Sequence, residues 1–126
     1  MNYKALHTCI RVKDLEKSIA FYEKALNMSV REKKDFPEDK FTLVYLQDGV
    51  SAHELELTYN YDHEAYDLGN GYGHMAYEVD NLEESYNTHK EAGYNITDIS
   101  GLSDQSASFY FITDPDGYDI EIIGRS

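Results

Sequence analysis

Two histidines and two glutamates are the residues of this 126-residue chain whose types and spacing could perform metal chemistry. The spacing from His7 to Glu56 is nearly the same as the spacing from His74 to Glu121. Two imidazole nitrogens and two carboxylate oxygens suit zinc, nickel, cobalt, manganese or iron, and such a set leaves coordination positions open for water or substrate. Each residue alone has a structural explanation, as a packing histidine or a solvated glutamate. The matched spacing favours one divalent metal site.

An internal repeat explains why these residues come in two His–Glu pairs. The segment HTCIRVKDLEKSIAFYEKALNM, which begins at His7, aligns without a gap to HMAYEVDNLEESYNTHKEAGYN, which begins at His74. Six aligned pairs are identical: His7/His74, Val12/Val79, Leu15/Leu82, Glu16/Glu83, Ser18/Ser85 and Ala25/Ala92. Self-similarity at a fixed offset indicates two copies of one structural unit.

Each copy is predicted to open with a strand and to continue with a capped amphipathic helix. The first strands are expected at 5–12 and 73–79. Asp14 and Asn81 are typical helix N-caps, and apolar side chains follow each of them at helical spacing. Gly93 is expected to end the second helix.

Further strands follow the helix in each copy. They are expected at about 28–34, 40–47 and 52–60 in the first copy and at about 96–100, 106–113 and 118–124 in the second. Asp48-Gly49 is typical of a β-hairpin. Asp114-Pro115-Asp116-Gly117 is typical of a tight turn.

The predicted architecture is α+β, with one domain over residues 1–126 built of two βαβββ modules. The first module covers about 1–62, a linker covers about 61–72, and the second module covers about 73–126. Each module would form a four-stranded sheet with one helix on one face. The two sheets are expected to face each other across a cleft.

Alternation along the strands predicts which side chains line that cleft, because successive side chains of a strand point to opposite faces. The first strand places His7 and Arg11 on one face, and the fourth strand places Glu56 and Asn60 on one face. The matching strands of the second copy do the same for the second histidine and the second glutamate. The opposite faces are mostly apolar and suit helix packing.

Composition restricts the class of protein. The net charge of −13 argues against binding nucleic acid or an anionic membrane, both of which favour Lys and Arg. No apolar run approaches the ~20 residues that span a bilayer. Cys9 is the single cysteine, so no disulfide framework suggests export. We therefore expect a cytoplasmic protein without nucleic-acid or membrane partners.

Five segments along the chain carry a resemblance to a known family. They are LHTCIRV (6–12), IAFYEKALNM (19–28), ELTYNY (56–61), YGHMAYEVDN (72–81) and DPDGYDIEII (114–123). In these segments the chain resembles glyoxalase I (lactoylglutathione lyase) of the vicinal-oxygen-chelate superfamily, in its short bacterial-type branch. The resemblance implies the superfamily's fold, glyoxalase/bleomycin-resistance/extradiol dioxygenase, with its paired βαβββ modules.

The same resemblance implies an activity: isomerisation of the methylglyoxal–glutathione hemithioacetal to S-lactoylglutathione, which removes methylglyoxal. It implies that His7, Glu56, His74 and Glu121 bind a divalent metal, with nickel or cobalt favoured over zinc. Proton transfer through an enediolate would use Glu121 as the base, with Glu56 opposite it. A homodimer is also implied, and the metal site could then form between chains or within one chain.

The residues that would bind the thiol carry over in part. Arg11 would pair with a glutathione carboxylate, although a structural ion pair would also explain it. Asn60 would hydrogen-bond the γ-glutamyl end, although a strand-end turn would also explain it. The loop GLSDQSAS (101–108) contains Asp104 and no Lys or Arg, and Asn70 stands where one branch of the family has Arg. A different low-molecular-weight thiol therefore stays open.

Other members of the superfamily supply the alternative functions. An extradiol dioxygenase would use His7, His74 and Glu121 on iron, and a fosfomycin-resistance thiol transferase would use a similar triad on manganese. A methylmalonyl-coenzyme A epimerase shares the proton-transfer chemistry. A drug-binding protein of the bleomycin-resistance type would need no metal. Glu56, the ELTYN segment and Arg11 favour glyoxalase I over these.

Overall fold

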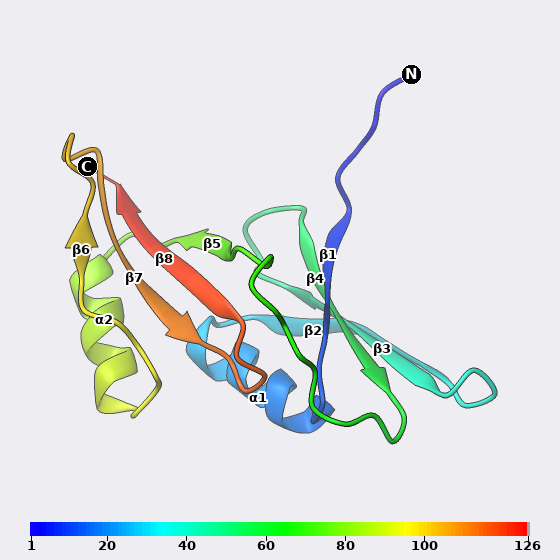
Figure 1. Ribbon diagram of the computed structural model, residues 1–126. Coiled ribbons are helices and arrows are strands. Elements are labelled where there is room, and N and C mark those ends of the chain that lie inside the picture. The colour runs from blue at the N-terminus through cyan, green and yellow to red at the C-terminus, as the bar shows by residue number, and fades with distance from the viewer. Residues whose placement is uncertain (126) are drawn as a thin grey trace. The chain divides into compact units, whose positions relative to one another are not determined.

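The chain divides into two compact units of similar size. A computed structural model describes residues 1–125. The first unit is Met1–Asp67 and the second is Leu68–Ser126. In Figure 1 the first unit runs from blue to green and the second from green to red. The division between them falls inside the segment that the sequence marks as a linker.

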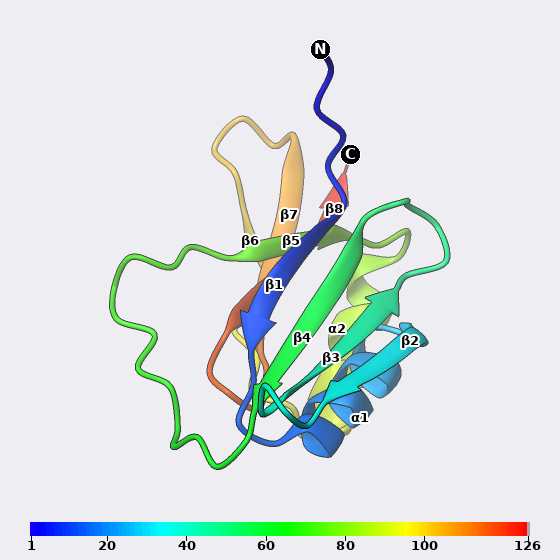
Figure 2. The ribbon, with the colours of Figure 1, turned by 90° about the vertical axis from the view of Figure 1, so that its right-hand side faces the viewer.

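The first unit holds one helix and one four-stranded sheet. Its elements are β1 (His7–Arg11), α1 (Leu15–Ala25), β2 (Ser29–Phe36), β3 (Phe41–Gln47) and β4 (Glu54–Asn60). The strand order is β1-β4-β3-β2, with β1 parallel to β4 and the other neighbours antiparallel. Figure 2 shows this sheet in front, with α1 behind it.

The second unit repeats this plan element by element. Its elements are β5 (Met75–Glu78), α2 (Leu82–Glu91), β6 (Ser100–Gly101), β7 (Ala107–Thr113) and β8 (Asp119–Arg125). The strand order is β5-β8-β7-β6, again with the first pair parallel and the others antiparallel. The predicted α+β class and the two βαβββ modules are confirmed.

Both helices begin at the predicted caps. The Asp14 side chain accepts a hydrogen bond from the Lys17 backbone N–H, and the Asn81 side chain accepts one from Glu84, each at 3.1 Å. These bonds satisfy donors that the first turn of a helix leaves without intrahelical partners. Gly93 follows α2 with a φ of 83°, a conformation in which glycine is unstrained, so it ends this helix as predicted.

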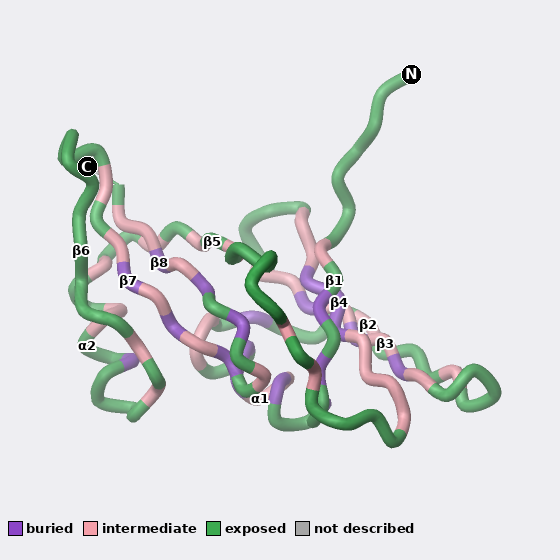
Figure 3. The backbone as a smooth tube through the Cα atoms, in the orientation of Figure 1, coloured by how far each residue is buried: buried purple, intermediate pink, exposed green. Residues whose placement is uncertain are grey.

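One face of each sheet is buried and carries the core. In the first unit the fully buried side chains come from alternate positions of the inner strands, as Val44 and Leu46 on β3 and Leu55 and Leu57 on β4 do. Figure 3 shows these buried stretches interrupted by half-exposed ones along the strands. The alternation leaves the second face of each sheet available for polar chemistry.

Two sequence predictions are wrong in detail. β5 begins at Met75, where pairing with β8 starts, so His74 precedes the strand and does not lie within it. The segment 96–100 is not a strand: Ile96 forms a single bridge, and β6 spans two residues only. The hairpin expected at Asp48-Gly49 is present: β3 and β4 are antiparallel neighbours joined by residues 48–53, where the Asp48 carboxylate accepts the backbone N–H groups of Val50 and Ser51. Other bounds differ by one or two residues.

Close packing of α2 on its sheet depends on Gly124. A Cβ added at Gly124 would stand 2.9 Å from Leu82 Cβ, well inside the separation of nonbonded carbons. We expect Gly124→Ala to lower the free energy of unfolding by about 1–3 kcal/mol, because the helix must shift away from β8. Urea denaturation measures this. The control is Gly71→Ala, where no described atom lies within 4 Å of the new Cβ; equal stabilities of the two variants would contradict the prediction.

Candidate metal centre

The first unit brings His7 and Glu56 together. Cys9 pairs with Glu56 across β1 and β4, so His7, two residues earlier, shares the face of Glu56. His7 Nε2 lies 3.5 Å from Glu56 Oε2. The Glu56 side chain is only 12% exposed, whereas that of His7 is 36% exposed. The carboxylate is thus held in the sheet surface and the imidazole lies above it.

The second unit forms the matching pair. Ala76 pairs with Glu121 across β5 and β8, and His74 lies two residues before Ala76. His74 Nε2 lies 3.2 Å from Glu121 Oε1, and the Glu121 side chain is 17% exposed. The repeat seen in the sequence is therefore also a repeat of side-chain geometry.

The donor atoms of each pair fit two ligands of one metal ion. Imidazole nitrogen and carboxylate oxygen bind such ions at about 2.0–2.2 Å, which places two adjacent ligand atoms about 2.8–3.6 Å apart. Both observed separations, 3.5 and 3.2 Å, lie in this range. Within residues 1–125 no three or more His, Cys, Asp or Glu side chains gather into a metal-binding cluster. Each unit therefore presents a half-site of one nitrogen and one oxygen donor.

The two predicted thiol-binding residues lie on the same face as the first pair. Arg11 is the last residue of β1 and pairs with Thr58, two positions from Asn60 on β4. Arg11 is exposed and Asn60 is half-buried. Asn60 Nδ2 donates a hydrogen bond to the Tyr66 hydroxyl at 2.9 Å, and the Tyr66 ring stacks on His63. The amide is thus fixed in orientation by a residue beyond the strand.

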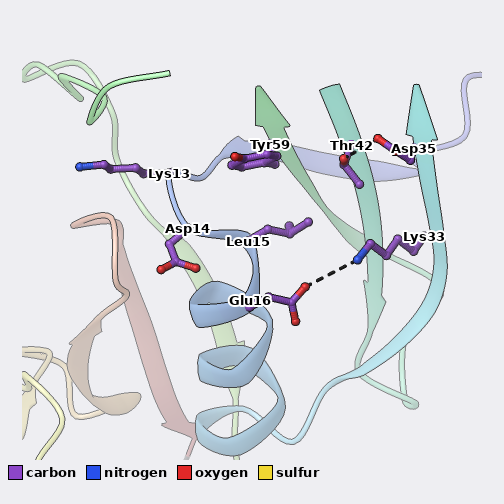
Figure 4. Close-up of a pocket in the computed structure, with 8 residues that line it drawn as sticks. All are labelled: Lys13, Asp14, Leu15, Glu16, Lys33, Asp35, Thr42 and Tyr59. Carbon is purple, nitrogen blue, oxygen red and sulfur yellow. Dashed lines mark hydrogen bonds and ion pairs between the residues drawn. The ribbon is translucent and has the colours of Figure 1, made fainter. Parts of the chain in front are cut away.

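A groove of about 580 Å³ lies elsewhere in the first unit, where α1 begins (Figure 4). Its lining residues are Lys13, Asp14, Leu15, Glu16, Lys33, Asp35, Thr42 and Tyr59. Lys33 pairs with Glu16 across it at 3.6 Å, and the Thr42 hydroxyl donates to Asp35 at 2.8 Å. These polar groups satisfy one another, so the groove resembles a charged surface recess more than a binding site.

Comparison with known proteins decides the family. Residues 4–122 match the model of the Glyoxalase/Bleomycin resistance protein/Dioxygenase superfamily. The lactoylglutathione lyase of Neisseria meningitidis serogroup A is 44% identical, over 97% of this chain and 91% of the relative. The lactoylglutathione lyase of Salmonella typhimurium is 42% identical, over 95% and 91%. The chain belongs to the glyoxalase I family.

Solved structures of glyoxalase I have the same fold. The trypanothione-dependent glyoxalase I of Leishmania major is 39% identical with a TM-score of 0.83, over 98% of this chain and 87% of that one. Glyoxalase I of Zea mays is 34% identical with a TM-score of 0.87, and this chain spans 45% of its length. These relatives favour an isomerising enzyme over the dioxygenase, transferase, epimerase and drug-binding alternatives.

Dependence on a divalent metal is general to the glyoxalase I family, and the donor separations of the two half-sites fit such an ion. Neither of the two helices in the described part of the chain is long and apolar enough to cross a membrane.

The surroundings of Glu56 include polar groups that sequence reasoning missed. Tyr45 lies directly opposite Glu56 on β3 and donates a hydrogen bond to its carboxylate, which raises the pKa of Tyr45 to about 12. The Thr58 hydroxyl reaches the same carboxylate at 3.4 Å, and Cys9 Sγ lies 3.2 Å from Thr58. Burial, followed by the neighbouring Glu56, raises the pKa of the Cys9 thiol. Alternation along β3 could have placed Tyr45 on the polar face of the sheet. It could not have shown that Tyr45 pairs with Glu56, because that depends on the register between β3 and β4.

Proposed function

We propose that this chain is a metal-dependent lactoylglutathione lyase. It isomerises the hemithioacetal that forms from methylglyoxal and glutathione to S-lactoylglutathione, and so detoxifies methylglyoxal. The observation that carries the proposal is the pair of repeat-matched His–Glu half-sites, with donor separations of 3.5 and 3.2 Å. The lactoylglutathione lyases at 42–44% identity support it.

In this proposal His7, Glu56, His74 and Glu121 hold one divalent ion, with nickel or cobalt favoured over zinc. When bound, the ion supplies Lewis-acid stabilisation for the negative charge that develops on the substrate oxygens. An ion that accepts more than four ligands would bind these four side chains and still accept those oxygens. The histidines hold the site, since a neutral imidazole is the commonest protein metal ligand.

Glu121 performs the proton transfer. Its carboxylate takes the proton from the carbon that bears sulfur and returns it to the adjacent carbon, which was the ketone carbon of methylglyoxal. The C–H bond breaks at the first carbon and forms at the second, and the hydroxyl proton of the first carbon ends on the former ketone oxygen, so the substrate is isomerised without a redox partner. A carboxylate that is 17% exposed has few waters to compete for that proton.

Arg11 and Asn60 bind the thiol end of the substrate. The Arg11 guanidinium pairs with a carboxylate of glutathione, and the Asn60 amide, oriented by Tyr66, hydrogen-bonds the γ-glutamyl end. Asp104, in the loop between β6 and β7, is exposed and acidic, and this loop adds no cation to hold glutathione. Another low-molecular-weight thiol is therefore the second substrate to test.

We further propose a cytoplasmic homodimer. In one arrangement each metal site takes His7 and Glu56 from one chain and His74 and Glu121 from its partner. In the other arrangement both half-sites of a site come from one chain. The repeat-matched half-sites are compatible with both.

An absorbance assay tests the proposed function. Metal-stripped protein is mixed with methylglyoxal and glutathione, and thioester formation is followed after addition of nickel, cobalt, manganese or zinc. We expect no turnover without metal and the highest kcat with nickel or cobalt. Turnover only with another thiol would change the thiol assignment. Absence of turnover with every metal and thiol would overturn the proposal.

A further inference from the structure

The two repeat-matched glutamates have the same histidine partner but different neighbours. Glu56 and Glu121 occupy the same position in their sheets, and each lies within 3.5 Å of a histidine nitrogen. A reaction that moves one proton needs one carboxylate as base and leaves the other in a different role. The neighbours in each sheet are the structural source of such a difference.

Glu56 is surrounded by hydroxyl groups. Tyr45 faces it across β3 and β4 and donates a hydrogen bond to it, and Thr58 donates a second at 3.4 Å. The Tyr45 ring is itself fixed from two sides. His7 packs on it edge-to-face at 5.7 Å, and the Arg31 guanidinium lies 5.4 Å from the ring centre. Arg31 is in turn paired with Glu54, so the hydroxyl is held in place over Glu56.

Apart from His74, the described neighbours of Glu121 on its own sheet carry no hydroxyl group. Phe111 faces it across β7 and β8, in the position that Tyr45 has in the first unit. Ile123 occupies the position of Thr58, and Ala76 pairs with Glu121 as Cys9 pairs with Glu56. His74 packs on Phe111 at 5.1 Å, edge-to-face as His7 packs on Tyr45. The two sites thus share their aromatic packing and differ in their hydroxyls.

Hydrogen-bond donors restrict how a carboxylate can move. A glutamate held by two hydroxyls keeps one orientation, as the outer partners of metal-binding side chains generally ensure. A glutamate among apolar neighbours can rotate about its side-chain torsions, which a base must do to reach two adjacent carbons in turn. The structure therefore distinguishes a carboxylate with two hydroxyl partners, Glu56, from one without a hydroxyl partner among its described sheet neighbours, Glu121.

We propose that Tyr45 is a positioning residue that makes the two carboxylates unequal: its hydroxyl anchors Glu56, so that Glu121 alone carries the proton. This inference rests on the proposed lyase activity. The same reasoning makes Phe111 the residue that keeps Glu121 mobile. The difference between the two roles lies in one hydroxyl group, which exchange between Tyr and Phe removes or adds with the ring retained.

The first test measures metal affinity and needs no turnover. Apo Tyr45→Phe is titrated with cobalt against a chromophoric chelator. We expect about tenfold to hundredfold weaker binding than in the wild type, the usual effect of removing a partner of a metal-binding side chain. The matched control is Tyr59→Phe. It also removes a tyrosine hydroxyl, but Tyr59 lies three residues after Glu56 on β4, so its side chain points to the opposite face of the sheet. Unchanged affinity in Tyr45→Phe would overturn the anchoring role.

The second test asks whether Glu56 gains the role of base once it is released. Tyr45→Phe is expected to lower kcat in the wild-type background but to raise the residual kcat of Glu121→Gln, because a mobile Glu56 then reaches the substrate. A packing role for Tyr45 predicts a loss in both backgrounds, and that result would overturn the proposal. Phe111→Tyr is expected to lower kcat with KM unchanged, and it keeps the question answerable if Tyr45→Phe does not fold.

These results are separable from failure of the proposed function. If the wild-type protein turns over no hemithioacetal, the lyase assignment fails in the wild type itself. The cobalt titration still reports whether Tyr45 anchors Glu56. If the wild type is active, the lyase assignment stands. The Tyr45 proposal is then overturned if Tyr45→Phe leaves the cobalt affinity unchanged and has the same effect on kcat in the wild-type and Glu121→Gln backgrounds.

Discussion

Glu121→Gln is expected to abolish isomerisation while the fold is retained. Gln keeps the shape of the side chain and one oxygen ligand but cannot accept the substrate proton. Removal of a general base lowers rates by about 10²–10⁴-fold. We expect a fall in kcat of this size in the absorbance assay, with an unchanged urea midpoint and with metal still bound.

Glu78→Gln is the matched control for Glu121→Gln. It removes the same charge from the neighbouring strand β5, where the Glu78 side chain is 62% exposed and pairs with Arg125 at 3.5 Å. We expect its kcat to match that of the wild type. Near-full turnover in Glu121→Gln would remove Glu121 from the role of base. Loss of bound metal in Glu121→Gln would instead identify Glu121 as a metal ligand whose negative charge is essential for binding.

The repeat and the strand faces were predictable because they depend on local periodicity. His7 and Glu56 are distant in the sequence, yet each is the polar member of an alternating strand, and β1 pairs with β4. The caps Asp14 and Asn81 were equally local, because a side chain that accepts a backbone N–H three residues later needs no tertiary contact. These local features predicted the order of the elements and the sheet face that His7 and Glu56 share.

Features that depend on register or on side-chain competition were not predictable. The register of β3 against β4 places Tyr45 opposite Glu56, and alternation alone does not give that register. The length of the hairpin connection is another such feature, because the Asp48 carboxylate accepts two backbone N–H groups within the loop. Before β6, the Thr97 side-chain hydroxyl accepts the Phe111 backbone N–H, and only Ile96 forms a bridge to β7 there.

The two copies of the repeat differ in the residues that neighbour their glutamates. A histidine and a glutamate persist at matched positions of the two copies, while the residues opposite the glutamates differ, Tyr45 in one sheet and Phe111 in the other. A duplicated unit starts with two equivalent carboxylates. A proton-transfer reaction is served by unequal ones, and the second layer of residues is where that inequality arises in this chain.

Removal of either histidine of the proposed metal site is expected to abolish tight metal binding by the whole protein. If one ion needs both half-sites, His7→Ala and His74→Ala each leave three protein ligands, and each should eliminate turnover. If each His–Glu pair bound its own ion, each variant would instead lose half of the bound metal. Calorimetric titration with nickel distinguishes these cases. We expect one ion per chain in the wild type, with a loss of binding of equal size in both variants.

Thermal unfolding independently measures whether metal binding depends on both histidines. A ligand at about 100 times its Kd stabilises the folded state by about 2.7 kcal/mol, so nickel should raise the Tm of the wild type. His7→Ala and His74→Ala should lose this increase, while His53→Ala should keep it, because His53 bonds Thr8 at 2.9 Å and neither glutamate. A metal-dependent Tm increase that survives in His7→Ala or His74→Ala would show that the ion does not need both half-sites. Loss of the increase in both variants, with the His53→Ala control intact, is the result that four ligands on one ion require.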